Sequence, residues 1–170
     1  LYTRHHVLHA HQTCLGVSNG WVITNRGAYG WCLSTSDGTQ LATGMEPAQG
    51  MLPSSYRAEG YGMLSLLRFL THIFNFCGTP PRCSAVYSDN IALVFRIARQ
   101  ISTHQWHPNE TLSSEWDVVQ AIVYTLKQFP VTPIVKHVRG HQDQDIAYAL
   151  LSLQAQLNVD ADAAATLYQI

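Results

Sequence analysis

The sequence predicts a mixed α/β fold, with three antiparallel strands followed by helices and strands in alternation. The first third of the chain carries short β-like runs. Ser36-Asp37-Gly38 between two of them is a hairpin signal, because glycine adopts positive φ readily. Later stretches repeat apolar residues at three- and four-residue steps, which is the spacing of a helix with one buried face. Short apolar runs separate these stretches, as expected of strands joined by crossover helices.

Five strands are expected in all. The first three form an antiparallel meander, and the last two join it through right-handed crossovers. Their predicted ranges are 6–17, which includes Val7, Leu8 and a Thr-Cys-Leu run, then 27–35, 39–46, 84–87 and 133–138.

Helices are expected between and after the later strands. The first covers about 55–76, and Gly78-Thr79-Pro80-Pro81 ends it because proline cannot continue a helix. Ser114 and Asp117 have the spacing of a capping box, which predicts a helix that begins there. The remaining predicted helices cover 90–102, 114–128 and most of 146–168.

Composition limits the classes of function. The 170 residues fit one domain, and the 46% that are hydrophobic suffice for a sizeable core. Ten basic and eleven acidic residues give a net charge of −1, so no basic balance indicates nucleic acid. No apolar run reaches the roughly 18 residues that a membrane-spanning helix needs. Four cysteines without a C-x-x-C pair favour buried thiols in a reducing, intracellular compartment. Since the chain starts at Leu1, we expect a fragment of a longer polyprotein.

Three carboxylates stand out by position. Glu59 follows the register of the buried face of the first predicted helix, Asp89 follows an apolar strand, and Asp162 lies four residues after Asn158. In α/β sheets ligands gather at the carboxyl ends of strands, and carboxylates that converge there repel one another unless a cation neutralises them. Hard oxygen ligands suit Mg²⁺ or Mn²⁺. The ordinary alternatives are a helix-dipole partner for Glu59, a helix cap for Asp89 and a solvated helix residue for Asp162.

Four segments in a fixed order carry a more specific signal than any single residue. They are Ser54-Ser55-Tyr56-Arg57-Ala58-Glu59, Tyr87-Ser88-Asp89, His137-Val138-Arg139-Gly140-His141-Gln142-Asp143 and Leu157-Asn158-x-x-x-Asp162. Together with the strand Gly27-Ala28-Tyr29-Gly30-Trp31, they resemble the ribonuclease H (type 1) domain of retroelement reverse-transcriptase polyproteins, over roughly residues 7–168.

The resemblance implies a ribonuclease H-like five-stranded mixed sheet flanked by helices, as a single domain over residues 1–170. It also implies metal-dependent hydrolysis of the RNA strand of RNA–DNA hybrids. Glu59, Asp89 and Asp162 would then be catalytic ligands of a two-metal site for Mg²⁺ or Mn²⁺. His141 matches a mobile histidine that assists proton transfer or product release, although a lone loop histidine is usually polar surface. The implied partners are an RNA–DNA hybrid and adjoining reverse-transcriptase domains, with no membrane.

One departure from the family lies in the first predicted strand. The family has a fourth metal ligand there, an aspartate near the strand's end that is followed by glycine and a small residue. Aligned with the stretch 13–17, this aspartate corresponds to Cys14, and Asp37 in the hairpin is a poor substitute. A neutral thiol is a weak ligand for Mg²⁺. We therefore expect hydrolysis to be severely reduced or absent.

Alternatives remain open at this point. The register of the first strand can be shifted, or another carboxylate can serve as the ligand. In function, the alternatives are a catalytically inactive nucleic-acid-binding or scaffolding module of a reverse transcriptase, and a decaying element without a selected function.

Four other residues are weaker candidates. His9 and His11 alternate on the first predicted strand as a metal pair, against the ordinary interpretation of a frayed polar terminus. Trp31 is expected to pack within the sheet, whereas Trp106 in a loop is a candidate surface contact to nucleic acid. Residues 102–113 contain no Lys or Arg, so binding to phosphates is expected to be weak and strongly salt-dependent.

Overall fold

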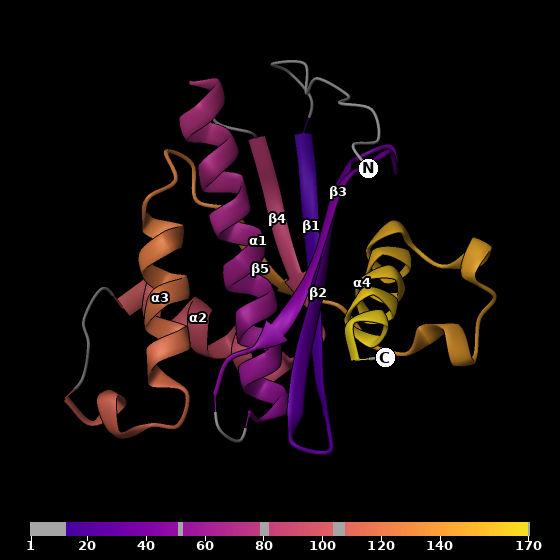
Figure 1. The fold of residues 1–170 in the computed structure, drawn as a ribbon. Coiled ribbons are helices and arrows are strands. Elements are labelled where there is room, and N and C mark those ends of the chain that lie inside the picture. The colour runs from indigo at the N-terminus through magenta and orange to yellow at the C-terminus, as the bar shows by residue number, and fades with distance from the viewer. Residues whose placement is uncertain (1–12, 51–52, 79–81, 104–107, 170) are drawn as a thin grey trace.

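The chain forms one five-stranded mixed sheet with helices on both faces, as the sequence predicts (Figure 1). The structure is a computed structural model, and it describes residues 13–50, 53–78, 82–103 and 108–169. The strand order across the sheet is β3-β2-β1-β4-β5. The strands are β1 (Thr13–Ile23), β2 (Arg26–Thr35), β3 (Gln40–Ala48), β4 (Arg82–Ser88) and β5 (Ile134–His137).

Tight turns join the first three strands into the expected antiparallel meander. Thr24 and Asn25 connect β1 to β2 with φ of 46° and 65°, the positive values that a two-residue hairpin loop requires at both positions. The predicted turn before β3 is confirmed, with Gly38 at φ 93°. β4 and β5 then add in parallel on the other side of β1.

The first strand runs further than the sequence predicted. The expected range was 6–17, but β1 continues to Ile23, because ten residue pairs from Cys14 to Ile23 are held in register against β2. The hairpin at Thr24 and Asn25 lacks the Asn-Gly or Asp-Gly pair by which such turns are recognised, so the strand's end gave no signal. Residues 6–12, with His9 and His11, lie outside the described residues, as does Trp106.

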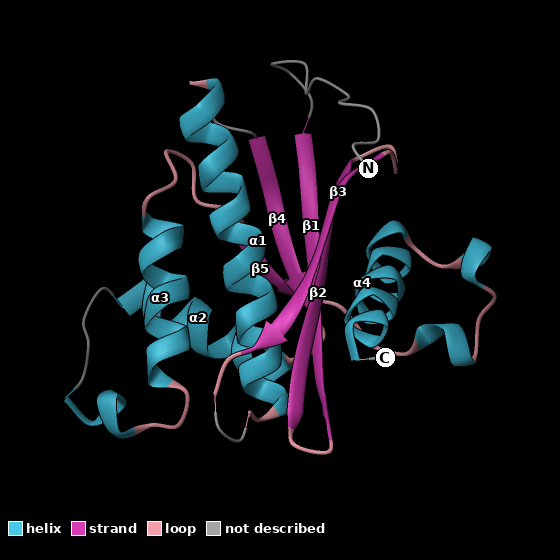
Figure 2. Cartoon of the chain, in the orientation of Figure 1, coloured by secondary structure: helices cyan, strands magenta, loops and turns pink. Residues whose placement is uncertain are grey.

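Helices cover the two faces of the sheet unequally (Figure 2). α1 crosses the face of the central strands, with α2 and α3 beside it, and α4 packs on the opposite face against β1 and β2. The helices are α1 (Ser55–Cys77), α2 (Ile91–Thr103), α3 (Trp116–Lys127) and α4 (Leu153–Gln169). None of the helices in the described part of the chain is long and apolar enough to cross a membrane.

α1 has the ends that the sequence predicts. The Ser54 side chain accepts a hydrogen bond from the Arg57 backbone N–H, which satisfies one of the free donors of the first turn. Gly78 closes the helix in the left-handed region at φ 67°. Cys77, in the last turn, is exposed, whereas Cys14, Cys32 and Cys83 are buried.

The start of α3 differs from the prediction. The expected capping box began at Ser114, but the helix begins at Trp116, and the preceding Glu115 is left-handed with φ 57° and makes no side-chain cap. Asp117 is drawn away from a capping role because both of its carboxylate oxygens accept hydrogen bonds from the Arg57 guanidinium. The capping-box prediction is therefore wrong, and Arg57 instead ties the starts of α1 and α3 together.

The C-terminal region is less helical at its beginning than predicted. Within the expected range of 146–168, α4 starts only at Leu153. Before it come two short 3-10 turns, at Gln142–Gln144 and Tyr148–Leu150. The Tyr148 hydroxyl donates to the Asp160 carboxylate, which fastens this segment to α4.

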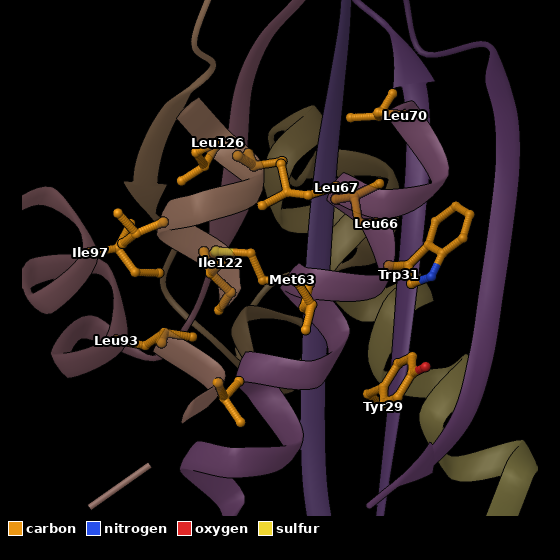
Figure 3. Close-up of a cluster of buried hydrophobic side chains, with 14 of the residues drawn as sticks. Tyr29, Trp31, Met63, Leu66, Leu67, Leu70, Leu93, Ile97, Ile122 and Leu126 are labelled. Atoms are coloured by element: carbon orange, nitrogen blue, oxygen red, sulfur yellow. The ribbon is translucent and has the colours of Figure 1, made fainter. Parts of the chain in front are cut away.

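Two apolar cores lie on the two faces of the sheet. The larger core joins α1, α2 and α3 to the sheet, and Figure 3 labels its central residues: Tyr29, Trp31, Met63, Leu66, Leu67, Leu70, Leu93, Ile97, Ile122 and Leu126. Trp31 is 5% exposed and its indole N–H donates to the Ser65 hydroxyl, so the expectation that it packs on the sheet is confirmed. The smaller core, around Val17 and Leu157, joins α4 to the sheet.

Candidate active site

The candidate site lies where β1 and β4 run side by side toward their carboxyl ends. In their parallel register Ser18 is opposite Ser88, the last residue of β4, so that Asn19 on β1 and Asp89 directly after β4 are the next residues along the chain. The carboxyl ends of neighbouring parallel strands are the usual place for a ligand in an α/β sheet. The predicted residue Asp89 is thus placed at the expected end of its strand.

Two amide side chains hold Asp89. The Asn19 amide nitrogen, Nδ2, lies 3.2 Å from the Asp89 carboxylate oxygen Oδ2, and Nδ2 of Asn158 lies 3.5 Å from that same oxygen. The alternative that Asp89 caps α2 is wrong, because the side-chain oxygen of Asn90 accepts the hydrogen bond from the Leu93 backbone N–H. Asp89 is therefore free of a structural role in the helix and faces the amides.

Glu59 enters the site from the first turns of α1, only 5% exposed, as its place in the buried register predicted. α1 approaches β1 closely here, because a Cβ on Gly20 would lie 2.4 Å from the backbone carbon of Ala58. The Ser88 hydroxyl donates to the Glu59 carboxylate at 3.1 Å.

The Glu59 and Asp89 carboxylates are neighbours, and their charges are coupled. Burial raises the pKa of Glu59 well above its usual range, and the negative charge of Asp89 and a hydrogen bond with it raise that pKa further. The helix-dipole alternative for Glu59 does not account for this burial beside a second carboxylate. A proton or a cation is needed to neutralise the pair.

Asp162 and His141 stand at the rim of this pair. Burial raises the pKa of Asp162, the His141 side chain nearby opposes that rise, and the negative charges of Asp89 and Asp143 add to it. Asp162 is half-buried, so it is not the fully solvated helix residue of the alternative interpretation. His141 follows β5 in the left-handed conformation, at φ 52°, and is exposed. The four residues singled out from the sequence therefore come from α1, β4, the loop after β5 and α4 to one end of the sheet.

Most of the chain is similar in structure to solved proteins with a ribonuclease H domain. It aligns with ribonuclease H1 from the halophilic archaeon Halobacterium salinarum at a TM-score of 0.57 and 15% identity, covering 92% of this chain and 97% of that chain. It also aligns with the prototype foamy virus protease–reverse transcriptase at a TM-score of 0.64 and 16% identity, covering 94% of this chain and 21% of that one. For LC11 ribonuclease H1 in complex with an RNA/DNA hybrid, the TM-score is 0.57 at 13% identity, over 91% of this chain and 94% of that one.

The chain has the ribonuclease H fold. No family model and no curated protein matches the sequence, so the likeness rests on three-dimensional structure. Strand order and helix placement agree with the ribonuclease H-like class that the four sequence segments predicted.

Cys14 does not lie at the site of this ribonuclease H fold. Cys14 lies five residues before Asn19 on β1 and is opposite Cys83 of β4 in the sheet register. Its side chain is fully buried in the larger core. At about 3.3 Å per residue along a strand, five residues amount to about 16 Å. Placing Cys14 at the aspartate position was therefore wrong, because it assumed that the first strand ended near residue 17. Asp37 lies in the hairpin at the far end of the sheet, where its carboxylate accepts a hydrogen bond from the hydroxyl of Thr35, the partner of Cys14.

Asn19 is the residue that the sequence analysis missed. The expected family pattern is an aspartate followed by glycine near the end of the first strand, and Asn19-Gly20 occupies that place in the structure. The next residue, Trp21, departs from the small residue of the pattern. Extending the strand to Ile23 would have aligned Asn19 with the aspartate. The place of the expected aspartate is thus taken by an uncharged amide, whose nitrogen donates to Asp89.

The carboxylate oxygens of the candidate site suit a hard divalent cation, although the carboxylates are few. Among the described residues, no three His, Cys, Asp or Glu side chains are grouped so that they could hold a metal. Oδ1 of Asn158 is buried and has no hydrogen-bond partner, but the nitrogen of this amide, and not the oxygen, faces Asp89. Carboxylate and amide oxygens are the ligands that Mg²⁺ and Mn²⁺ prefer. The carboxylates of Glu59 and Asp89 therefore fit such a cation, whereas the two asparagines present amide nitrogens to Asp89.

Proposed function

We propose that the chain binds RNA–DNA hybrids and hydrolyses their RNA strand with a divalent cation, at a rate strongly reduced by Asn19. The observation that carries this proposal is the meeting of Glu59, Asp89, Asp162 and His141 at one end of a ribonuclease H fold, with an amide in the fourth place. The similar LC11 ribonuclease H1 is in complex with an RNA/DNA hybrid, which supports the same substrate class.

The catalytic roles follow from the positions of the side chains. Glu59 and Asp89 would hold the cation, because their carboxylates lie together and need neutralising charge. A bound divalent cation supplies Lewis acidity and a more acidic water for attack on a phosphodiester. Asp162, at the rim, orients His141 through the attraction of opposite charges, and His141 can take up or release a proton at the exposed mouth of the site.

The reduced rate that we propose would follow from the amide at Asn19. An aspartate in this place would present a third negative charge 3.2 Å from Asp89, whereas the asparagine presents none and donates a hydrogen bond to Asp89 instead. The site then draws cations less strongly, and less positive charge is available to stabilise the charge that develops on the phosphate.

A second function is favoured by the same hydrogen bonds. With the Asp89 oxygen held by two amides, the chain would bind the hybrid without cutting it, as a nucleic-acid-binding or scaffolding module beside reverse-transcriptase domains. With ten basic residues among 170, the electrostatic attraction to phosphates is modest. In either function the affinity for the hybrid should therefore fall steeply as the salt concentration rises, unless adjoining domains contribute.

The deciding experiment is cleavage of an end-labelled RNA–DNA hybrid in Mg²⁺ and, separately, in Mn²⁺. The proteins compared are the wild type, Asn19→Asp, Asp89→Asn and the matched control Cys14→Asp, which adds the same carboxylate at the other end of β1. We expect slow cleavage by the wild type, at least tenfold faster cleavage by Asn19→Asp, and none by Asp89→Asn. One order of magnitude corresponds to about 1.4 kcal/mol in the barrier.

The outcomes separate the two functions. If only Asn19→Asp cuts while the wild type retains hybrid binding, the binding module is the function. If Cys14→Asp is activated and Asn19→Asp is not, the assignment of the fourth position is wrong. If no variant binds or cuts a hybrid, both functions fail.

A further inference from the structure

Two of the four cysteines lie opposite each other in the sheet. Cys14 is the second residue of β1 and Cys83 is the second residue of β4, and the parallel register pairs them directly. Both side chains belong to the larger core, so they leave the sheet on the same face, whereas Leu15, the next residue of β1, belongs to the smaller core. The two thiols are therefore neighbours across the strand pair.

The spacing of paired strands allows a disulfide at this position. Neighbouring strands lie about 4.7–4.9 Å apart, and the Cα atoms of disulfide-bonded cysteines are usually about 4.4–6.8 Å apart. The register shifts directly after this pair, since Leu15 is opposite Ala85 and not Ser84. An irregularity of this kind disrupts the ladder locally, so the two backbones can adjust as a bond forms between the sulfurs.

The two thiols differ in acidity. The pKa of the Cys14 thiol is lowered, chiefly because the Cys83 thiol donates a hydrogen bond to it, and the same hydrogen bond raises the pKa of Cys83. The thiolate is the form of cysteine that attacks an oxidant. Cys14 would therefore react first, and Cys83 is placed to attack the product.

The other two cysteines are placed differently. Cys32 lies on β2 opposite Val17, in the smaller core on the other face of the sheet, and burial raises its pKa to about 12. Cys77 is exposed in the last turn of α1. The chain thus supplies its own controls, which are a buried thiol without an opposite cysteine and an exposed thiol.

An oxidant can reach the buried pair through the starts of the two strands. Thr13 and Arg82, the residues directly before the two cysteines, are exposed. The ends of strands open locally more readily than their middle. Hydrogen peroxide is a small oxidant that can enter through such an opening.

We propose that Cys14 and Cys83 form a redox modification site, at which hydrogen peroxide produces a reversible disulfide that links β1 to β4. The Cys14 thiolate attacks one peroxide oxygen, and the O–O bond breaks to give a sulfenic acid and hydroxide, which takes up the proton that Cys14 released. The Cys83 sulfur then attacks the Cys14 sulfur, and the sulfenic oxygen leaves as water with the Cys83 proton. Two thiols and one peroxide give one disulfide and two waters, so the sulfurs lose the two electrons that the peroxide gains. A dithiol reductant reverses the step by exchange.

The link would stabilise the fold without touching the candidate active site. It lies toward the starts of the strands, whereas Asn19 and Asp89 lie toward their carboxyl ends. It closes a loop of about 70 residues, and such a cross-link stabilises chiefly by restricting the unfolded chain. Oxidation should therefore raise the Tm, by about 5–10 °C.

The test is oxidation of the folded Cys77→Ser chain with hydrogen peroxide, since the exposed thiol that could join two copies is then absent. We expect two of its three remaining thiols to be lost and to be regained with dithiothreitol. Peptide mapping by mass spectrometry should find Cys14 joined to Cys83. In the same background, the matched control Cys32→Ala should still form the link, whereas Cys83→Ala should not.

Mapping of the oxidised wild-type chain decides the question even where a variant fails to fold. The proposal is overturned if the folded chain keeps all its thiols, if Cys14 ends as a sulfinic acid beside a free Cys83, or if the bond joins another pair. Thermal unfolding of the oxidised and reduced Cys77→Ser chains gives the second readout. An oxidised chain that does not unfold at a higher temperature than the reduced one would refute the stabilising role of the link.

Discussion

Replacing Asn19 by aspartate should make the stability of the fold depend on a divalent cation. The substitution changes the amide nitrogen that donates to Asp89 into an anionic oxygen, 3.2 Å away from the Asp89 oxygen and beside buried Glu59. Two unit charges at that distance repel by about 5 kcal/mol at an effective dielectric constant of about 20.

Protonation sets an upper limit on this loss. The new carboxyl can instead take up a proton, and holding an aspartic acid protonated at pH 7 requires about 4 kcal/mol, from its ordinary pKa of about 3.9. We therefore expect Asn19→Asp to lose about 4 kcal/mol of unfolding free energy in a chelator. For a chain of this size, that corresponds to a fall in Tm of about 8–16 °C.

A cation should reverse most of this loss. Mg²⁺ at a hundred times its dissociation constant returns about 2.7 kcal/mol to a protein that binds it only when folded. The assay is thermal unfolding of the wild type, Asn19→Asp and Cys14→Asp, each in chelator and in excess Mg²⁺. Cys14→Asp, with its carboxylate buried in the core away from the site, should be destabilised without rescue. The reasoning is refuted if Asn19→Asp unfolds within about 2 °C of the wild type in chelator, or if Mg²⁺ rescues both variants equally.

Two further substitutions probe the surroundings of the site. Gly140→Ala places a Cβ 2.6 Å from the Asp89 oxygen, so we expect weaker Mn²⁺ binding in a titration and, by overpacking, a loss of about 1–3 kcal/mol of unfolding free energy. The control is Arg139→Ala at the exposed neighbouring residue, which should leave Mn²⁺ binding unchanged. Arg57→Met removes the hydrogen bonds that lower the pKa of Asp117. A carboxyl whose pKa is lowered by folding stabilises the folded state above its ordinary pKa of about 4, and this stabilisation is lost as the pH falls through the folded-state pKa. Acid unfolding below about pH 4 should therefore be less steep in Arg57→Met, by a small amount because Asp117 is mostly exposed, and an unchanged acid limb would contradict the role of this ion pair.

Periodicity predicted the fold well where one face of an element is buried. The spacing of apolar residues in α1 predicted that Glu59 lies on the buried face of the helix, and the short apolar run before Asp89 predicted β4. Both residues could therefore be identified from the sequence. These signals depend on local burial, which the sequence records directly.

The end of β1 could not be predicted in the same way. The stretch from Ser18 to Ile23 is held in the sheet by pairing with β2 and by the turn at Thr24 and Asn25, neither of which has a strong local signature. The error at Cys14 followed from this, since a register fixed by a distant strand decides which side chain reaches Asp89. The prediction for the start of α3 was wrong for a similar reason, because Arg57 from another helix donates hydrogen bonds to Asp117.

The distribution of the four cysteines makes the chain suitable for distance measurements. Cys77 is exposed, whereas Cys14, Cys32 and Cys83 are buried, so a maleimide dye or spin label would attach selectively at the end of α1 in the folded protein. Eighteen residues of helix separate Cys77 from Glu59, a span of about 27 Å, which lies within the working range of energy transfer and of pulsed dipolar spectroscopy. A label there would report how a duplex carrying a second label lies across the sheet end without touching the carboxylates.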